Sequence, residues 1–158
     1  MIDIKQYTDS SFCLKCRGCC RFFSDIWLPH LLEEDRERLG IEKVVLSQGK
    51  SGPICQFLNE SDNYCGIYGR HPFECRIYPF LLVRREQTLD LAAHLSCPYV
   101  MKTFDSQIFK DYARYLAGLL QSADILPLLK DERHKFHSYP EIELFLILKD
   151  VITAANSF

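Results

Sequence analysis

The feature that most constrains this chain is a run of cysteines near its N-terminus, Cys13-Leu-Lys-Cys16-Arg-Gly-Cys19-Cys20. Its first three thiols follow the C-x2-C-x2-C spacing, in which a tight loop lets thiolates converge on one centre, as in iron–sulfur proteins of the bacterial ferredoxin type. Zinc sites more often combine two separate C-x2-C knuckles, and no second C-x2-C follows in this chain. The spacing therefore favours an iron–sulfur cluster and keeps zinc as an alternative.

Four more cysteines stand singly further along the chain, at Cys55, Cys65, Cys75 and Cys97. Two four-coordinate sites would use all eight thiolates. Neighbouring side chains diverge, so we expect Cys20 to serve a different role from Cys19: to bind a second metal, to bridge two metals, or to stay free.

Other side chains next to these cysteines are candidates for a supporting role. His71 and His94 precede single cysteines by a few residues, and either could replace a thiolate as a ligand. Arginines beside cysteines could neutralise the negative charge that four thiolates leave around a metal; they are Arg17, Arg70 and Arg76.

The composition predicts a globular protein, because 47% of the residues are hydrophobic and 13% are aromatic. The N-terminus carries acidic residues and has no apolar stretch typical of a secretory signal, and no window is long enough to span a membrane. We therefore expect a cytoplasmic location, where thiols stay reduced and serve as metal ligands rather than disulfides. The net charge of -2, with no strongly basic patch, gives no reason to expect a nucleic-acid partner.

The expected fold class is α+β, a small irregular cysteine-rich domain with short antiparallel strands and two to three packing helices. A single domain over residues 1–158 is expected, with the metal-binding region at 13–97 and a helical C-terminal part at 103–158. We expect a helix at 29–39 that Gly40 ends, a hairpin of 54–58 with 64–68, and strands at 80–85 and 88–95.

The C-terminal part shows two further patterns. A helix that begins at Asp105 or Ser106 is predicted, because five residues after that point fall on one helical face: Ile108, Tyr112, Tyr115, Leu116 and Leu119. A capping-box pattern at Ser138 and Glu141 predicts an apolar helix over residues 142–152.

Several segments together resemble a known family. They are the four-cysteine run, Cys65-Gly-Ile-Tyr68 and Cys75-Arg-Ile-Tyr-Pro-Phe80. The chain resembles the YkgJ-type cysteine-cluster family of zinc- or iron-chelating domains over residues 13 to about 97. The resemblance implies that all eight cysteines are metal ligands. The chain departs from the family's usual pattern at Arg70-His71-Pro72, where one extra residue separates the arginine from the proline.

Three functions are compatible with this pattern. The first is a metal protein that holds an iron–sulfur cluster or zinc. The second is an enzyme, because the flagellin lysine methylases contain a similar cysteine region, although this chain shows no G-x-G-x-x-G loop. The third is delivery of a metal or cluster, or an adaptor that docks on a protein partner through the helix expected at 142–152.

Overall fold

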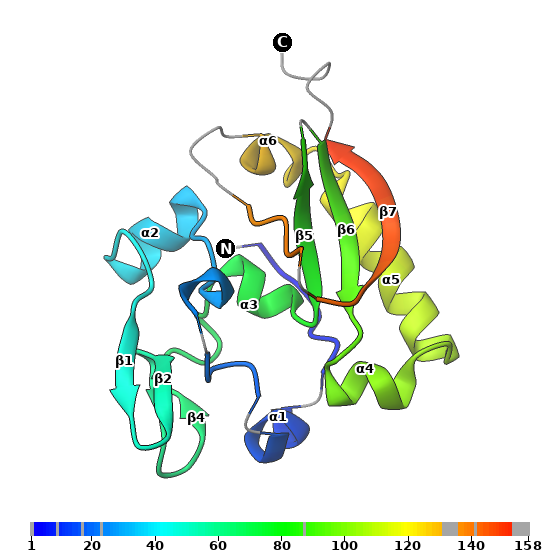
Figure 1. The fold of residues 1–158 in the computed structure, drawn as a ribbon. Helices are drawn as coiled ribbons and strands as arrows, with labels where there is room; N and C mark the ends of the chain where they lie inside the picture. The colour runs from blue at the N-terminus through cyan, green and yellow to red at the C-terminus, as the bar shows by residue number, and fades with distance from the viewer. Residues whose placement is uncertain are drawn as a thin grey trace. The chain divides into compact units, whose positions relative to one another are not determined.

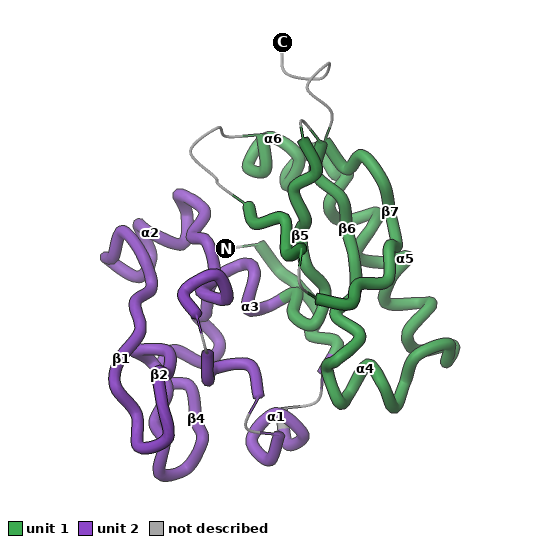
Figure 2. Tube along the Cα trace, in the orientation of Figure 1, with its two compact units in different colours: residues 1–7, 77–158 green, residues 8–76 purple. Residues whose placement is uncertain are grey.

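The computed structural model of this chain describes residues 2–8, 10–16, 18–22, 24–86, 88–130, 136–140 and 142–152. It divides into two compact units (Figure 2). Unit 2 is Thr8–Arg76, and unit 1 combines Met1–Tyr7 with Ile77–Phe158. Helices and short antiparallel strands occur together, which confirms the predicted α+β class. The expectation of a single domain stays a prediction.

Unit 2 carries seven of the eight cysteines on short elements (Figure 1). These are α1 (Ser10–Cys16), the 3-10 helix η1 (Asp25–Trp27), α2 (Glu33–Leu39), β1 (Leu46–Gly49), β2 (Gly52–Cys55), β3 (Leu58–Asn59), β4 (Tyr64–Cys65) and the start of α3 (Phe73–Ile77). β1 pairs with β2, and β3 pairs with β4, both antiparallel. Its small core is made of Leu31, Val44, Ile54, Cys55 and Leu58, with Cys20 packed against it. Thiols are therefore part of this core.

The local predictions for unit 2 are confirmed in part. Gly40 ends α2 with a φ of 66°, as expected, but the helix begins at Glu33 rather than at Pro29. The expected hairpin exists only between β3 and β4, because the backbone of β2 pairs with β1 instead.

The cysteine run was expected to form a tight loop, and its first half does not. Cys13 and Cys16 lie on α1, where residues three apart share one face of the helix. No glycine or proline interrupts residues 10–16, and among the described residues of the run the turn comes later, at Gly18 to Cys20. The loop prediction is therefore wrong for Cys13 and Cys16.

Unit 1 is built on one antiparallel sheet with the strand order β5-β6-β7 (Figure 1). Its strands are β5 (Phe80–Arg85), β6 (Thr88–His94) and β7 (Leu144–Ile152), and its helices are α4 (Pro98–Thr103), α5 (Gln107–Leu120) and α6 (Leu126–Leu129). The first two strands confirm the prediction for this part of the chain. Six α-helices occur among the described residues, more than expected, because all but α5 are too short to show an apolar repeat.

The long helix α5 packs on the sheet through aromatic side chains. Ser106 caps it by accepting a hydrogen bond from the Phe109 backbone N–H at 3.2 Å, as the sequence suggested. The Phe80 ring stacks on Phe109 with centroids 5.6 Å apart. The predicted apolar face is confirmed at Tyr112 and Leu116, which are buried. It is wrong at Ile108, which is 64% exposed, whereas the neighbouring Phe109 is buried.

The predicted helix at 142–152 is wrong: this segment is the strand β7, which pairs with β6. An apolar run of this length does not distinguish a helix from a strand, and pairing with a neighbouring strand decides between them. Ser138 lies in an irregular segment, and Glu141, the second half of the expected capping box, lies outside the described residues.

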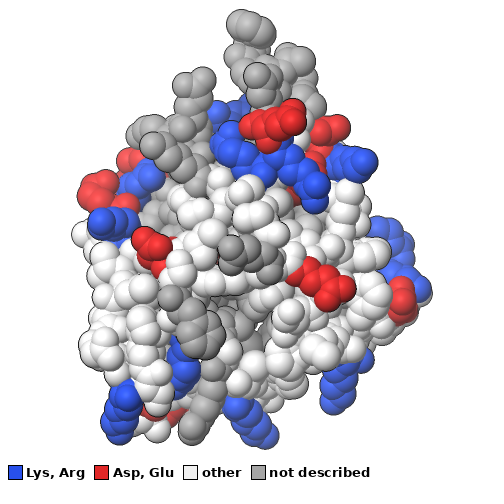
Figure 3. Space-filling model, in the orientation of Figure 1, with Lys and Arg blue, Asp and Glu red and all other residues white. Residues whose placement is uncertain are grey.

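Two properties of the described surface bear on the expected partners. Among the described residues, no helix is both long enough and apolar enough to cross a bilayer. On the described part of the face in Figure 3, basic side chains gather at the top of the view with acidic side chains beside them, and both signs are scattered over the rest of that face.

Candidate metal centre

The backbone of unit 2 places Cys20 beside Cys55. After the turn at Gly18, the chain runs along β2 through an antiparallel bridge between Arg21 and Ile54. The Cys55 backbone N–H donates to the Cys20 carbonyl oxygen at 2.9 Å, and the Phe22 N–H donates to the Pro53 carbonyl oxygen at 3.1 Å. Cys20 therefore points into the small core, whereas its neighbour Cys19 is exposed.

Cys55 and Cys65 occupy equivalent positions, each at the end of a strand and before a turn. Burial raises the pKa of both thiols, but a backbone hydrogen bond from the residue two positions later, Phe57 or Ile67, opposes that shift. The two turns are joined by the Gly66 N–H, which donates to the Phe57 carbonyl oxygen at 2.8 Å. Since an N–H donor favours the charged form of a thiol, this backbone is arranged to support thiolates.

Cys75 on α3 and Cys20 complete a group of four thiols, which we call the thiol quartet: Cys20, Cys55, Cys65 and Cys75. Burial raises the pKa of Cys75 well above its usual range, and negative charge on the other quartet members and on Glu74 adds to the shift. Burial also raises the pKa of Cys20 to about 12, with further contributions from Cys55, Cys65 and Cys13. These thiols lie close enough to oppose one another's ionisation, so a quartet of thiolates requires a compensating cation.

A buried carboxylate supports the helix that carries Cys75. Asp35 is 1% exposed and accepts hydrogen bonds from the backbone N–H groups of Phe73 at 2.9 Å and Leu32 at 3.3 Å. It also pairs with Arg38 and lies 3.9 Å from an Arg76 side-chain nitrogen. Asp35 therefore links α2 to the first residue of α3, two positions before Cys75.

The predicted arginine counter-ions have different surroundings. Burial lowers the pKa of Arg76, and the negative charge of Asp35 opposes this shift more strongly than that of Cys75 does. Arg76 therefore balances Asp35 before it balances a thiolate. Arg70 is exposed, and its carbonyl oxygen accepts a hydrogen bond from Arg38. Arg17 lies outside the described residues.

The two candidate histidines lie in different units. In unit 2 the His71 ring stacks on Tyr68 with centroids 5.2 Å apart. Burial, followed by the positive charges of Arg76 and Arg38, lowers the pKa of His71 to about 4. In unit 1 the Nδ1 atom of His94 lies 3.0 Å from the Tyr78 hydroxyl group. Ligation by either histidine stays a prediction.

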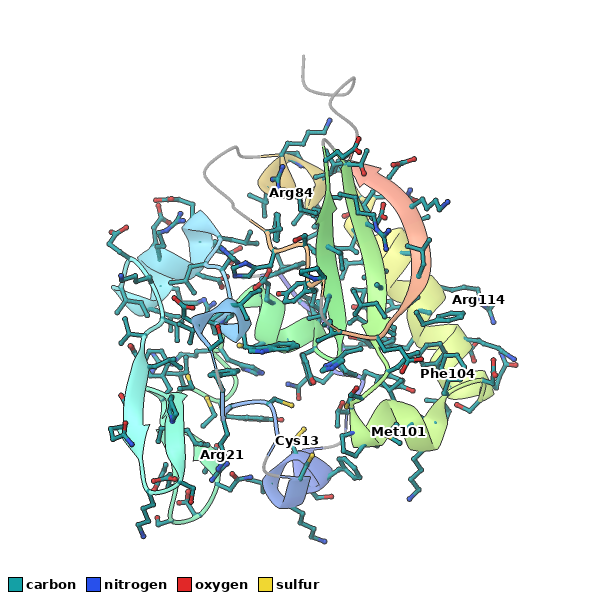
Figure 4. All side chains as sticks on the ribbon, viewed as in Figure 1. Cys13, Arg21, Arg84, Met101, Phe104 and Arg114 are labelled. Atoms are coloured by element: carbon teal, nitrogen blue, oxygen red, sulfur yellow. The ribbon has the colours of Figure 1, made fainter. Side chains whose placement is uncertain are left out.

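The remaining cysteines differ in exposure. Cys13 is exposed on α1, where Figure 4 labels its side chain, and Cys16 is half-buried one turn later. Cys97 is buried in unit 1 and immediately precedes α4. Within unit 2 the structure brings the quartet together, with Cys13 near enough to influence Cys20.

The quartet fits a metal by the chemistry of its donors rather than by a closed coordination geometry. Among the described residues, no three His, Cys, Asp or Glu side chains are arranged to hold a metal ion. Sulfur donors suit both zinc and iron–sulfur clusters. A metal that binds here would draw the thiols together, because binding and folding are coupled at such sites.

Two supporting residues were not predicted from the sequence. Asp35 resembles an ordinary surface acid in the first turn of a helix, and only its burial against Phe73 reveals its role. Asn63, in the turn between β3 and β4, donates hydrogen bonds to carbonyl oxygens of α1 that lie about 50 residues earlier in the chain. Local sequence patterns contain no signal for contacts of this range.

Comparison with known proteins adds one finding to this geometry. No curated protein and no solved structure matches the chain. A family of cysteine-rich domains matches residues 12–98, which is more than half of the chain and includes all eight cysteines. This chain therefore belongs to the CxxCxxCC family, described as a "putative zinc- or iron-chelating domain".

Proposed function

We propose that this chain is a metal-binding protein whose thiol quartet, Cys20, Cys55, Cys65 and Cys75, holds zinc or an iron–sulfur cluster. The observation that carries the proposal is that the four thiols lie near one another in unit 2. The Cys55 backbone N–H donates to the Cys20 carbonyl oxygen at 2.9 Å, and two of the thiols accept backbone N–H bonds. Negative charge on members of the quartet raises the pKa of Cys20, Cys55 and Cys75. When bound, zinc contributes folding free energy, whereas an iron–sulfur cluster also supplies one-electron redox chemistry.

The protein's own contribution is to hold the four donors near one another before the metal binds. The N–H groups of Phe57 and Ile67 orient two of the sulfurs and favour their charged form. The strand-like pairing of residues 20–22 with β2 fixes a third donor. Asp35 holds the N-terminal end of α3 and with it the fourth.

The other four cysteines remain proposed ligands because they all lie within the residues that the family match covers. They are Cys13, Cys16, Cys19 and Cys97. The helix expected to dock on a protein partner is the strand β7, so an adaptor role loses that basis. We propose a cytoplasmic location on the sequence argument alone.

Anaerobic purification followed by metal, sulfide and visible-absorption analysis tests the proposal. Iron with acid-labile sulfide and a broad visible band would identify a cluster, and a colourless protein with stoichiometric zinc would identify zinc. A folded protein that retains neither metal, even after reconstitution with each, would overturn the proposal.

Single Cys→Ser substitutions then test the quartet itself. Each member replaced by serine should lose most of the bound metal. Ile54→Val is the matched control, because it trims the same small core beside Cys55 without removing a thiol. If Ile54→Val loses as much metal as Cys55→Ser, the loss reflects destabilisation and not ligation.

A further inference from the structure

One side chain of unit 2 connects three segments that carry cysteines. Asn63 lies in the turn between β3 and β4 with a φ of 60°, a conformation that asparagine tolerates better than most residues. Its Nδ2 atom donates to the Leu14 carbonyl oxygen at 2.8 Å and to the Cys13 carbonyl oxygen at 3.3 Å. Its Oδ1 atom accepts a hydrogen bond from Arg21, which directly follows Cys20. Figure 4 labels Cys13 and Arg21.

The two carbonyl groups that Asn63 contacts belong to the last four residues of α1. Carbonyl groups at this end of a helix are the ones available to partners outside the helix. A helix of seven residues is marginal in isolation, so its position depends on such tertiary contacts. The Asn63 amide therefore determines where α1 is held against the hairpin that carries Cys65.

We propose that Asn63 is a positioning residue that presents Cys13 on α1 to the metal centre formed by the thiol quartet. The inference rests on the proposed function and extends it by placing Cys13 beside the four ligands of that centre. Cys65 follows Asn63 by two residues, so this contact holds α1 next to a segment that carries a member of the quartet. The Arg21 contact joins the same asparagine to the residue that follows Cys20.

Asn63→Asp removes the hydrogen bonds that residue 63 donates to α1 and keeps the one that it accepts from Arg21. The aspartate keeps an oxygen for Arg21 and tolerates positive φ, but it loses the N–H donors to α1. Cys13 should then be released while the quartet stays in place. Gln48→Glu is the matched control, because it also removes an amide hydrogen bond to a carbonyl oxygen, that of Gly49 at 3.1 Å, on the exposed strand β1.

Alkylation of the metal-loaded protein with iodoacetamide, read at each cysteine by mass spectrometry, tests the role. Asn63→Asp should speed alkylation of Cys13 about fivefold, the effect of losing one net hydrogen bond, while Cys55 and Cys75 stay protected. Gln48→Glu should leave all rates unchanged. An unchanged rate at Cys13, or an equal rise at every cysteine, would overturn the positioning role.

Two further outcomes keep this test separate from that of the proposed function. If the wild-type protein retains no metal, the proposed function fails before any variant is compared. If it retains metal and Cys13 does not respond to Asn63→Asp, only the positioning role fails. Should the aspartate variant not fold, Asn63→Gly removes the same donors at a positive φ that glycine adopts without strain.

Discussion

At Cys20 the surroundings oppose the thiolate form that a metal requires. Burial raises the pKa of this thiol to about 12, and the other three members of the quartet are shifted in the same direction. In the metal-free protein near neutral pH all four are protonated. Metal binding at the quartet must therefore release protons, and the apparent affinity must fall as the pH falls.

We predict that about four protons are released for each zinc ion bound, one from each thiol. Calorimetric titration of the metal-free protein in buffers of different ionisation enthalpy measures this number. The Cys20→Ser variant should release about three. Release of fewer than two protons by the wild-type protein would contradict a site made of neutral thiols.

The shifted pKa of His71 predicts how the free energy of unfolding depends on pH. Its pKa lies at about 4 in the folded protein and near 6.5 in the unfolded chain, so the unfolded chain takes up the proton first as the pH falls. Stability should therefore decrease between pH 6.5 and pH 4, by on the order of 3 kcal/mol in full. Urea unfolding of His71→Phe, which keeps a ring against Tyr68, should show a shallower decrease.

The control for that prediction is Tyr68→Phe, which keeps a ring against His71 and leaves the His71 imidazole in place. Its stability should follow the wild-type pH dependence. Because metal release on acidification affects all three proteins alike, the comparison between them isolates the histidine. Parallel curves for wild type and His71→Phe would refute the assignment.

At the scale of elements, Asp35 joins α2 to α3 and lies between two arginines of low exposure, Arg38 and Arg76. Asp35→Asn removes a negative charge that both guanidinium groups face, and removal of one partner of a buried pair typically costs roughly 3 to 5 kcal/mol. Urea denaturation should report a loss of that size. It should also report lower metal retention, because α3 carries Cys75.

Asp111→Asn provides the control for Asp35→Asn. Asp111 pairs with Arg114 at 2.6 Å on α5, but both side chains are more than half exposed. Solvent-exposed pairs contribute at most about 1 kcal/mol. A similar loss of stability in the two variants would show that the buried pairs of Asp35 stabilise the fold no more than an exposed pair does.

The elements that were predicted correctly are those whose signal is local. The strands β5 and β6 were expected because two β-rich runs flank a short turn, and Gly40 was expected to end α2 because glycine adopts positive φ readily. The strand β7 was mistaken for a helix because its pairing with β6 is a long-range property. The same limit applies to the site: spacing indicated the cysteines, but only the fold shows that Cys20 faces Cys55 and that Asn63 reaches α1.

At the scale of the whole molecule, the two units differ in what stabilises them. Unit 1 has a sheet and an aromatic core in which Phe80, Phe109 and Tyr112 pack together. The core of unit 2 is small and includes thiols, and small cores commonly depend on a metal. Metal removal should therefore affect unit 2 far more than unit 1.

Hydrogen–deuterium exchange before and after treatment with a chelator measures this difference. We expect amides of β2 and β4 to lose most of their protection, while β5 and β6 retain theirs. The amides of α5 serve as an internal reference within unit 1. Equal loss in both units, or no loss in either, would contradict a metal that stabilises Thr8–Arg76 specifically.

The most direct test of the central claim is X-ray absorption spectroscopy of the purified protein at the zinc or iron edge. The thiol quartet predicts a first shell of sulfur: about four sulfurs at ~2.3 Å for zinc, or sulfur with a nearby iron shell for a cluster. A first shell dominated by nitrogen or oxygen would show that the metal is held by other residues, and the assignment of Cys20, Cys55, Cys65 and Cys75 would then be wrong.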